Sequence, residues 1–143
     1  MAAAASYLLD TNVISELRKA RSGRAHANVI RWAEHVDAAS LHLSVVTIEE
    51  IETGIARCER RDPAQATLLR IWLEHSVLKA FAGRILAVDV HVARSSGRSN
   101  APDRRPHGDR LIAATARVHG MTVVTRNVAD FEGLDVPVLD PWG

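Results

Sequence analysis

The sequence predicts an α/β protein, a three-layer α/β/α sandwich around a five-stranded, mostly parallel sheet. Short apolar segments alternate along the chain with longer segments of helical periodicity, and this alternation is typical of βαβ units. The 143 residues are enough for one domain with a buried core, and 47% of them are hydrophobic. Because there is neither an internal repeat nor a low-complexity linker, we expect a single domain over residues 1–143.

Five apolar segments are the expected strands. They cover residues 7–9, 41–46, 85–88, 122–124 and 136–139. The last of them contains Pro137, which lacks a backbone donor and therefore suits an edge strand. One doubly wound sheet accommodates all five segments.

Helical patterns separate these strands. A helix is expected near Thr11 with Asp10 as its candidate cap, and behind Thr47 as a candidate N-cap, Ile48, Ile51 and Ile55 recur at i, i+3 and i+7. The remaining helices open at Asp62-Pro63 with Leu68, Leu69 and Trp72, at Asp89 with an end near Gly97, and at Pro106 with Leu111, Ala114 and Val118 before Gly120.

The composition limits where the protein works. The one cysteine, Cys58, excludes an internal disulfide and a cysteine-built zinc site. No apolar run approaches the ~20 residues of a membrane helix, and the start of the chain lacks the basic and apolar regions of a signal peptide. We therefore expect a cytoplasmic protein that has no membrane partner.

Basic residues are concentrated in two segments, although the net charge is only +1. Residues 16–31 contain five Lys or Arg against one acid, and residues 94–110 contain five Arg against two acids. Such segments can contact the phosphates of a nucleic acid. They are equally well explained as solvated surface.

Acidic residues gather where an open parallel sheet binds its ligands, beyond the carboxyl ends of the strands. They are Asp10, Glu49 and Glu50, Asp109, and Asp130 five residues after Thr125. Converging carboxylates repel one another unless a cation lies between them, and hard oxygen ligands suit Mg²⁺ or Mn²⁺. Two such ions about 3.5–4 Å apart can hold a phosphodiester and activate a water molecule. The pattern therefore indicates metal-assisted phosphodiester hydrolysis.

Each acid also has a purely structural interpretation. Asp10 can cap a helix, Glu50 has capping-box spacing from Thr47, Asp109 can interact with a helix dipole, and Asp130 can solvate a turn. None of these interpretations explains why the acids gather at one end of the predicted sheet.

Four segments resemble, in order, the motifs of PIN-domain ribonucleases of the VapC toxin family. They are residues 7–15 (YLLDTNVIS), 43–55, 109–116 (DRLIAATA) and 124–131 (VTRNVADF), and they span most of the chain. The resemblance implies a PIN-like domain and an endoribonuclease, the toxin of a type II toxin–antitoxin pair, which hydrolyses RNA by metal-activated water. It also implies Mg²⁺ or Mn²⁺, a homodimer, and a VapB-like antitoxin whose tail occupies the cleft.

The resemblance further implies a catalytic site of Asp10, Glu50, Asp109 and Asp130, in which Asp10 and Asp109 match the direct metal ligands of the family. Asn12, Thr125 and Asn127 match supporting positions that hydrogen-bond water at the metal. Some PIN domains carry an acid where this chain has Asn127, so the fourth position stays open between Asp130 and Asn127. Only the resemblance selects Glu50, because Glu49 and Glu50 flank the isoleucine stripe at similar angles.

Arginines beside the acidic residues are the expected substrate-binding groups. Arg104, Arg105 and Arg110 cluster near Asp109 in the sequence, and an acidic pocket needs a positive rim to admit a polyanion. We therefore expect these arginines to hold the RNA backbone.

Three other functions were weighed. An aspartyl-phosphate phosphatase needs a second acid two residues after its nucleophile, where this chain has Asn12. A signalling receiver domain needs paired acids after its first strand, and Asp10 stands alone there. A catalytically weak RNA-binding PIN-like module is the remaining alternative, and the intact acidic set argues against it.

Overall fold

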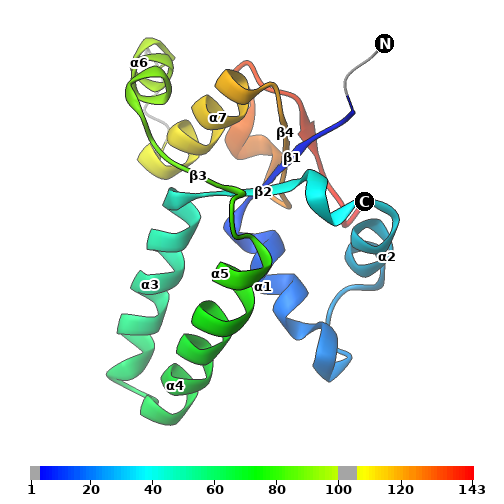
Figure 1. The fold of residues 1–143 in the computed structure, drawn as a ribbon, viewed down its shortest axis with the longest axis vertical. Helices are drawn as coiled ribbons and strands as arrows, with labels where there is room; N and C mark the ends of the chain where they lie inside the picture. The colour runs from blue at the N-terminus through cyan, green and yellow to red at the C-terminus, as the bar shows by residue number, and fades with distance from the viewer. Residues whose placement is uncertain (1–3, 100–105) are drawn as a thin grey trace.

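A five-stranded parallel sheet forms the middle layer of the protein in a computed structural model, which describes residues 4–99 and 106–143 (Figure 1). The strands are β1 (Tyr7–Leu9), β2 (Leu41–Ser44), β3 (Ile85–Leu86), β4 (Thr122–Val124) and β5 (Val138–Leu139), in the spatial order β3-β2-β1-β4-β5. Each pairing in these described ranges is parallel. The predicted α/β sandwich is therefore confirmed.

Helices cover both faces of the sheet (Figure 1). The α-helices are α1 (Thr11–Arg18), α2 (Ala27–His35), α3 (Val45–Glu59), α4 (Pro63–Trp72), α5 (Leu78–Ala80), α6 (Val90–Arg98) and α7 (His107–His119). Short helical turns are η1 (Lys19–Ser22), η2 (Ala38–Ser40), η3 (Leu73–Val77) and η4 (Val128–Phe131). Helices α3 and α4 lie side by side as a hairpin that projects from the sheet (Figure 1).

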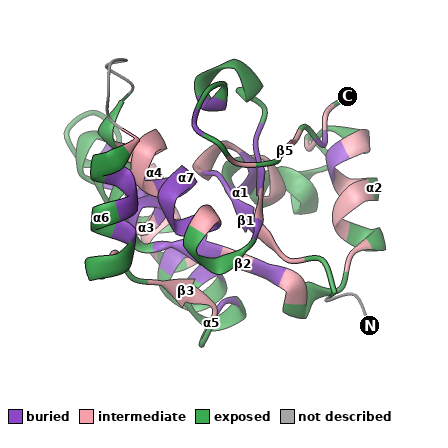
Figure 2. Ribbon diagram, turned by 90° about the horizontal axis from the view of Figure 1, so that it is seen from above, coloured by how far each residue is buried: buried purple, intermediate pink, exposed green. Residues whose placement is uncertain are grey.

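Alternating residues of the central strands enter two separate apolar cores. Leu9 and Val124 pack with residues from α1, α3, α4 and η3 on one face, whereas Leu8 and Val123 pack with α7 on the other. Successive side chains of a strand point to opposite faces, so both faces of the sheet are buried. Figure 2 shows buried residues along β1, β2 and α7 and exposed residues on the outer surfaces. This arrangement fixes the carboxyl ends of β1 and β4 side by side.

The predicted cap of α3 was wrong. Strand β2 ends at Ser44, whose Oγ accepts a hydrogen bond from the Val46 N–H at 3.0 Å, so the helix begins at Val45 rather than after Thr47. Thr47 is instead fully buried, and its Oγ1 accepts a hydrogen bond from Thr11 at 3.3 Å. Glu50 therefore lies well inside the helix, outside any capping box.

Other boundaries agree with their capping residues. Asp62 caps α4 through the Gln65 N–H, Asp89 caps α6 through the Val92 N–H, and Gly120 ends α7 at φ 67°. The edge strands β3 and β5 are shorter than predicted, and Pro137 precedes β5. The sequence prediction missed α2. Among the described residues, no helix is long and apolar enough to cross a membrane.

Candidate active site

Asp10 occupies the carboxyl end of β1 and is only 7% exposed. Its backbone N–H donates to the Val124 carbonyl at 2.9 Å, which extends the pairing of β1 with β4 by one residue. Its Oδ1 accepts a hydrogen bond from the Thr11 N–H at 2.8 Å and so caps α1. The helix-cap interpretation is thus correct, but it uses only one of the two carboxylate oxygens.

The second oxygen of Asp10 is held by two side chains. Thr125 Oγ1 donates to Asp10 Oδ2 at 2.8 Å, and Asn12 Nδ2 donates to the same oxygen at 3.2 Å and to Thr125 Oγ1 at 3.1 Å. Thr125 is fully buried at the end of β4. These bonds fix the orientation of the carboxylate before any ligand binds. The structure therefore brings together three of the predicted site residues, Asp10, Asn12 and Thr125, with Asn12 and Thr125 bonded to the Asp10 carboxylate.

The loop after β4 closes around the same three residues. The Arg126 N–H donates to Asn12 Oδ1 at 3.2 Å, and the Asn127 N–H donates to Thr125 Oγ1 at 3.0 Å. Asn127, a predicted supporting residue, thus takes part through its backbone. The contribution of Arg126 was not predicted from the sequence.

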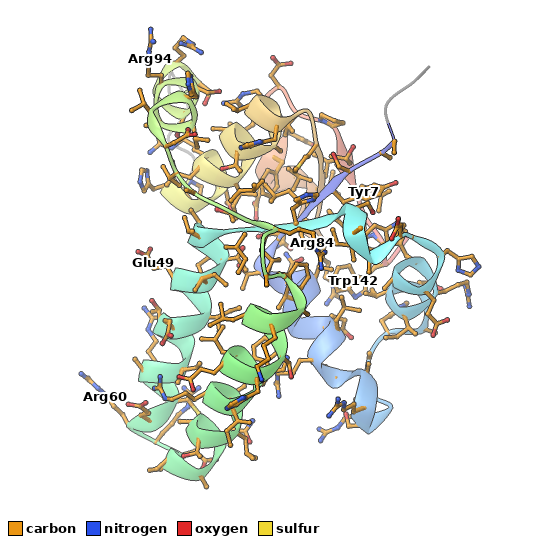
Figure 3. The ribbon with its side chains drawn as sticks, viewed as in Figure 1. Tyr7, Glu49, Arg60, Arg84, Arg94 and Trp142 are labelled. Carbon is orange, nitrogen blue, oxygen red and sulfur yellow. The ribbon has the colours of Figure 1, made fainter. Side chains whose placement is uncertain are left out.

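Glu50 joins the site through a residue that the sequence prediction missed. Thr11 Oγ1 donates to Glu50 Oε1 at 2.8 Å, so the residue after Asp10 ties α3 to α1. Glu49, its neighbour on α3, points away from the body of the molecule (Figure 3). A hydroxyl residue directly after the strand-end acid was the available signal for Thr11.

Burial and like charges raise the pKa values of both carboxyl groups. For Asp10 the main cause is desolvation, opposed by the hydrogen bonds from Thr125 and Thr11, while the negative charge of Asp130 raises the pKa further. For Glu50, desolvation again comes first, and the charges of Asp10 and Glu49 add to it. Each carboxylate is therefore easier to keep ionised when a cation is near.

Asp130 and Asp109 lie on two other elements, and of the two only Asp130 is shown to act on the charge of Asp10. Asp130 is exposed on η4, close enough to act on the charge of Asp10. Asp109 is half-buried in the first turn of α7. The residue before it, Gly108, lies against the start of α3, since a Cβ added there would be 3.5 Å from Val46 Cγ1. An open cavity between α3 and α7 is lined by Glu50 and His107 among others.

The predicted arginine rim is only partly described. Arg104 and Arg105 lie outside the described residues. Arg110 is half-buried next to Asp109, and its guanidinium contacts His107 Nδ1 at 3.2 Å. Its Nε atom is buried and has no hydrogen-bond partner among the residues described.

The donor set suits a hard divalent cation. Asp10 offers a buried carboxylate of raised pKa, and Glu50 and Asp130 add oxygen atoms and negative charge around it. Mg²⁺ commonly binds through one or two carboxylates and retains several water molecules. Within residues 4–99 and 106–143, no three acidic, His or Cys side chains already form a closed metal-binding group. An ion held partly through water fits such an open arrangement.

The chain was then compared with known protein families and structures. Residues 7–135 match the family model of the PIN domain. VapC ribonuclease Y4jK of Sinorhizobium fredii is 37% identical over 142 residues, covering 94% of this chain and 96% of that protein. Toxin FitB of Neisseria gonorrhoeae is 39% identical over 144 residues, covering 94% of this chain and 97% of FitB. The crystal structure of FitAcB from the same organism superposes with a TM-score of 0.85 at 34% identity, covering 95% of this chain and 98% of that one.

Proposed function

The chain belongs to the PIN-domain family, among its VapC-type toxins, and from this membership we propose that it is a Mg²⁺- or Mn²⁺-dependent endoribonuclease. In this proposal it acts as the toxin of a type II toxin–antitoxin pair and hydrolyses RNA phosphodiester bonds. The substrate class is supported by the ribonuclease name of a relative that is 37% identical. The metal dependence is supported by the chemistry of the acidic side chains.

The observation that carries the proposal is the buried Asp10 carboxylate. It is 7% exposed and it is acted on by the negative charge of Asp130, yet its oxygen atoms are held by donors of fixed direction. A protein that needed Asp10 only as a helix cap would require neither the Asn12–Thr125 support nor the neighbouring acids. Such a pre-oriented anionic group is what a metal-binding carboxylate requires.

Each residue then has a defined role. Asp10 and Asp109 hold the ion, and Glu50 and Asp130 complete the acidic pocket, partly through water molecules. A bound Mg²⁺ or Mn²⁺ supplies Lewis-acid stabilisation of the phosphodiester and a nucleophilic water at neutral pH. Asn12 and Thr125 keep Asp10 in one rotamer, and Thr11 does the same for Glu50. Arg104, Arg105 and Arg110 attract the RNA backbone.

Two protein partners belong to the proposal. A groove between α1, α3 and α4, with a volume of about 340 Å³, is lined by Thr11 and Glu50 of the acidic site and by Trp72 among others. Its apolar walls suit the tail of a VapB-like antitoxin, which would then reach the acidic pocket. A homodimer is supported by exposed apolar residues on α4, where Leu68 is 62% exposed and Ile71 50%. Light scattering of the purified protein tests the dimer, and a monomer at micromolar concentration contradicts it.

The cleavage experiment compares wild type with Asp10→Asn and Asp109→Asn on total RNA in Mg²⁺, in Mn²⁺ and in chelator. We expect cleavage by the wild type with either ion, none in chelator, and a loss of at least about a hundredfold in each variant, because an amide cannot supply the ligand charge. Asp62→Asn is the matched control. Its side chain caps α4 at the far end of the α3–α4 hairpin, and asparagine also caps helices.

The outcomes separate the enzyme from its alternative. Undiminished cleavage in chelator, or in both Asn variants, contradicts the metal mechanism. Tight RNA binding without turnover under every ionic condition would instead identify a catalytically weak RNA-binding module.

A further inference from the structure

The carboxyl ends of three neighbouring strands lie in register next to the acidic site. Leu9 pairs with Val124 and Val124 pairs with Leu139, so the residues that follow them, Asp10, Thr125 and Asp140, stand in one row. Strands in a sheet are ~4.8 Å apart, which puts Asp140 roughly 10 Å from Asp10. This separation is short enough for consecutive nucleotides of one strand to reach both positions.

A basic residue, Arg126, lies next to the middle position of this row. Arg126 follows Thr125 directly, and its backbone is anchored by the hydrogen bond to Asn12. Its guanidinium lies over the indole ring of Trp142, 5.5 Å from the ring centroid. Trp142 is itself held by two hydrogen bonds. Its backbone carbonyl accepts one from Asn28 Nδ2 at 2.8 Å, and its backbone N–H donates one to Asp140 Oδ1 at 2.9 Å. The Arg126 backbone is thus anchored to the Asp10 network, and its exposed guanidinium is held against Trp142.

An open cavity is lined by Asp140 and Pro141, the two residues before Trp142. It has a volume of about 590 Å³ and is bounded by Arg31, Trp32 and His35 of α2 and by Asp140 and Pro141 after β5. Figure 3 shows Trp142 on the α2 side of the molecule. The volume lies in the ~300–1,000 Å³ range of small-ligand sites, and such sites combine apolar walls with a few polar groups. The cavity offers the Trp32 indole, the donor side chains of Asn28, Arg31 and His35, and the Asp140 carboxylate.

We propose that this region, beyond β5, binds the nucleotide next to the cleaved phosphodiester, with its phosphate on Arg126 and its base in the cavity beside α2. The inference rests on the proposed ribonuclease function and deepens it by locating one side of the RNA path. Guanidinium planes and aromatic rings are the usual partners of unstacked RNA bases. Trp142 is a positioning residue here, since it acts on the RNA through Arg126.

RNA fits this region better than an acidic peptide does. The row from Asp10 to Asp140 connects the cavity to the site of hydrolysis, so its ligand must be continuous with the bound phosphodiester. Arg126 is also the basic residue whose own backbone is part of the Asp10 network. It supplies positive charge where the acids would otherwise repel the incoming strand.

Binding is measured separately from cleavage. A fluorescein-labelled single-stranded RNA of random sequence is titrated with the full-length protein in chelator, and its anisotropy is followed at several salt concentrations. We expect Arg126→Gln to weaken binding and to lower the salt slope by about 0.7, the value for one phosphate contact to a single strand. Arg31→Gln should weaken binding as well. Trp142→Leu should weaken it by at most the factor seen for Arg126→Gln, because Trp142 acts through Arg126, and Trp142→Phe should restore most of the affinity.

The charge-matched control is Arg60→Gln. Arg60 lies at the tip of the α3–α4 hairpin, away from the sheet (Figure 3), and its loss should leave both affinity and salt slope unchanged. Melting temperatures of all variants check that they are folded. Arg126 is exposed, so Arg126→Gln tests the proposal even where Trp142→Leu fails to fold.

Cross-linking gives the second readout. RNA that contains 4-thiouridine should cross-link to the peptides that carry α2 and residues 126–143. Cross-links confined to the groove between α1, α3 and α4 would overturn the proposal. Equal affinities for wild type, Arg126→Gln and Arg31→Gln would overturn it as well. If these variants bind RNA normally while metal-dependent cleavage persists, only the proposed nucleotide site beyond β5 is contradicted. If they lose binding in a protein that never cleaves RNA, only the proposed hydrolysis fails.

Discussion

Asp10 has two roles, as the cap of a helix and as an oriented, buried carboxylate. One oxygen caps α1, and the other is held by Asn12 and Thr125 in a buried position. Capping is worth about 1 kcal/mol, whereas burial of an ionised carboxylate opposes folding. The second effect explains the raised pKa of Asp10. The same side chain thus stabilises the folded protein as a helix cap and destabilises it as a buried charge.

Glu50 provides a residue-scale prediction that needs no ligand. Its pKa is raised in the folded protein, chiefly by desolvation. The folded state therefore holds the Glu50 proton to higher pH than the unfolded state does. Stability from this group is greatest below its unfolded pKa and falls as pH rises through the folded pKa. Glu50→Gln should raise the free energy of unfolding at neutral pH in chelator, by less than about 1 kcal/mol because the group is solvent-screened.

Denaturant titrations at neutral and at acidic pH check this expectation. Glutamine keeps an acceptor for the Thr11 hydroxyl, so the hydrogen bond is retained while the charge is lost. Glu49→Gln, one residue away and pointing outward, is the matched control and should shift stability less. If Glu50→Gln lowers the free energy of unfolding at neutral pH, the ionised Glu50 side chain stabilises the fold and the prediction is wrong.

Much of the site could be predicted from residue types and their order. Asp10, Asn12 and Thr125 came from motif positions, and the structure joins them by hydrogen bonds. Thr11 and Arg126 were missed because their roles depend on contacts across 39 residues and 114 residues of sequence. No local pattern encodes such contacts. The metal-ligand roles of Asp10 and Asp109 remain predictions.

At the scale of elements, the start of α3 was harder to predict than the starts of α4 and α6. Ser44 and Thr47 are both acceptable caps, and β2 with the first turn of α3 forms one continuous apolar run, so periodicity alone could not choose between them. The pairing of β2 with β3 sets this boundary, because Ser44 is the last residue of β2 that pairs with β3. Helix α2 was missed because it is only nine residues long and only Val29 in it is buried.

The end of α7 supports an element-scale prediction. Gly120 has φ 67°, in the left-handed region, and its N–H bonds back to the last turn of the helix. Gly120→Ala should destabilise the protein by about 1–2 kcal/mol, since a Cβ disfavours this conformation. Gly97→Ala is the control. Gly97 lies inside α6 with open space around it, and alanine should stabilise a helix there by about 0.5–1 kcal/mol.

Thermal melts of the two alanine variants test this pair directly. The expected shifts have opposite signs, so a general effect of added methyl groups cannot produce both. Equal melting temperatures would mean that the chain reversal after α7 does not depend on glycine.

At the scale of the whole molecule, metal binding and folding should be linked. A divalent ion that binds only the folded state stabilises it by about 2.7 kcal/mol at a hundred times its dissociation constant. Asp109→Asn should melt at the same or a higher temperature than wild type in chelator, because one repelling charge is removed. The variant should then gain much less from added Mg²⁺ or Mn²⁺.

Melts of wild type and Asp109→Asn in chelator and in millimolar Mn²⁺ separate the two roles of this residue. As a helix-dipole partner alone, Asp109 would contribute about 0.3–1 kcal/mol, and its loss would cost the same with and without metal. An equal metal-induced shift in both proteins would remove Asp109 from the proposed ligand set.

The position of β1 between β2 and β4 has a consequence for how the protein is made. Asp10 is synthesised early, but the Thr125 hydroxyl that orients it lies 115 residues further along the chain. Ribosomes add about 5–20 residues per second, so for several seconds the nascent chain carries the first acid without its partner. Pairing over so long a separation also slows folding. Under the proposed function, the oriented Asp10 carboxylate is complete only once β4 has emerged and paired, so RNA cleavage begins only with the nearly complete fold.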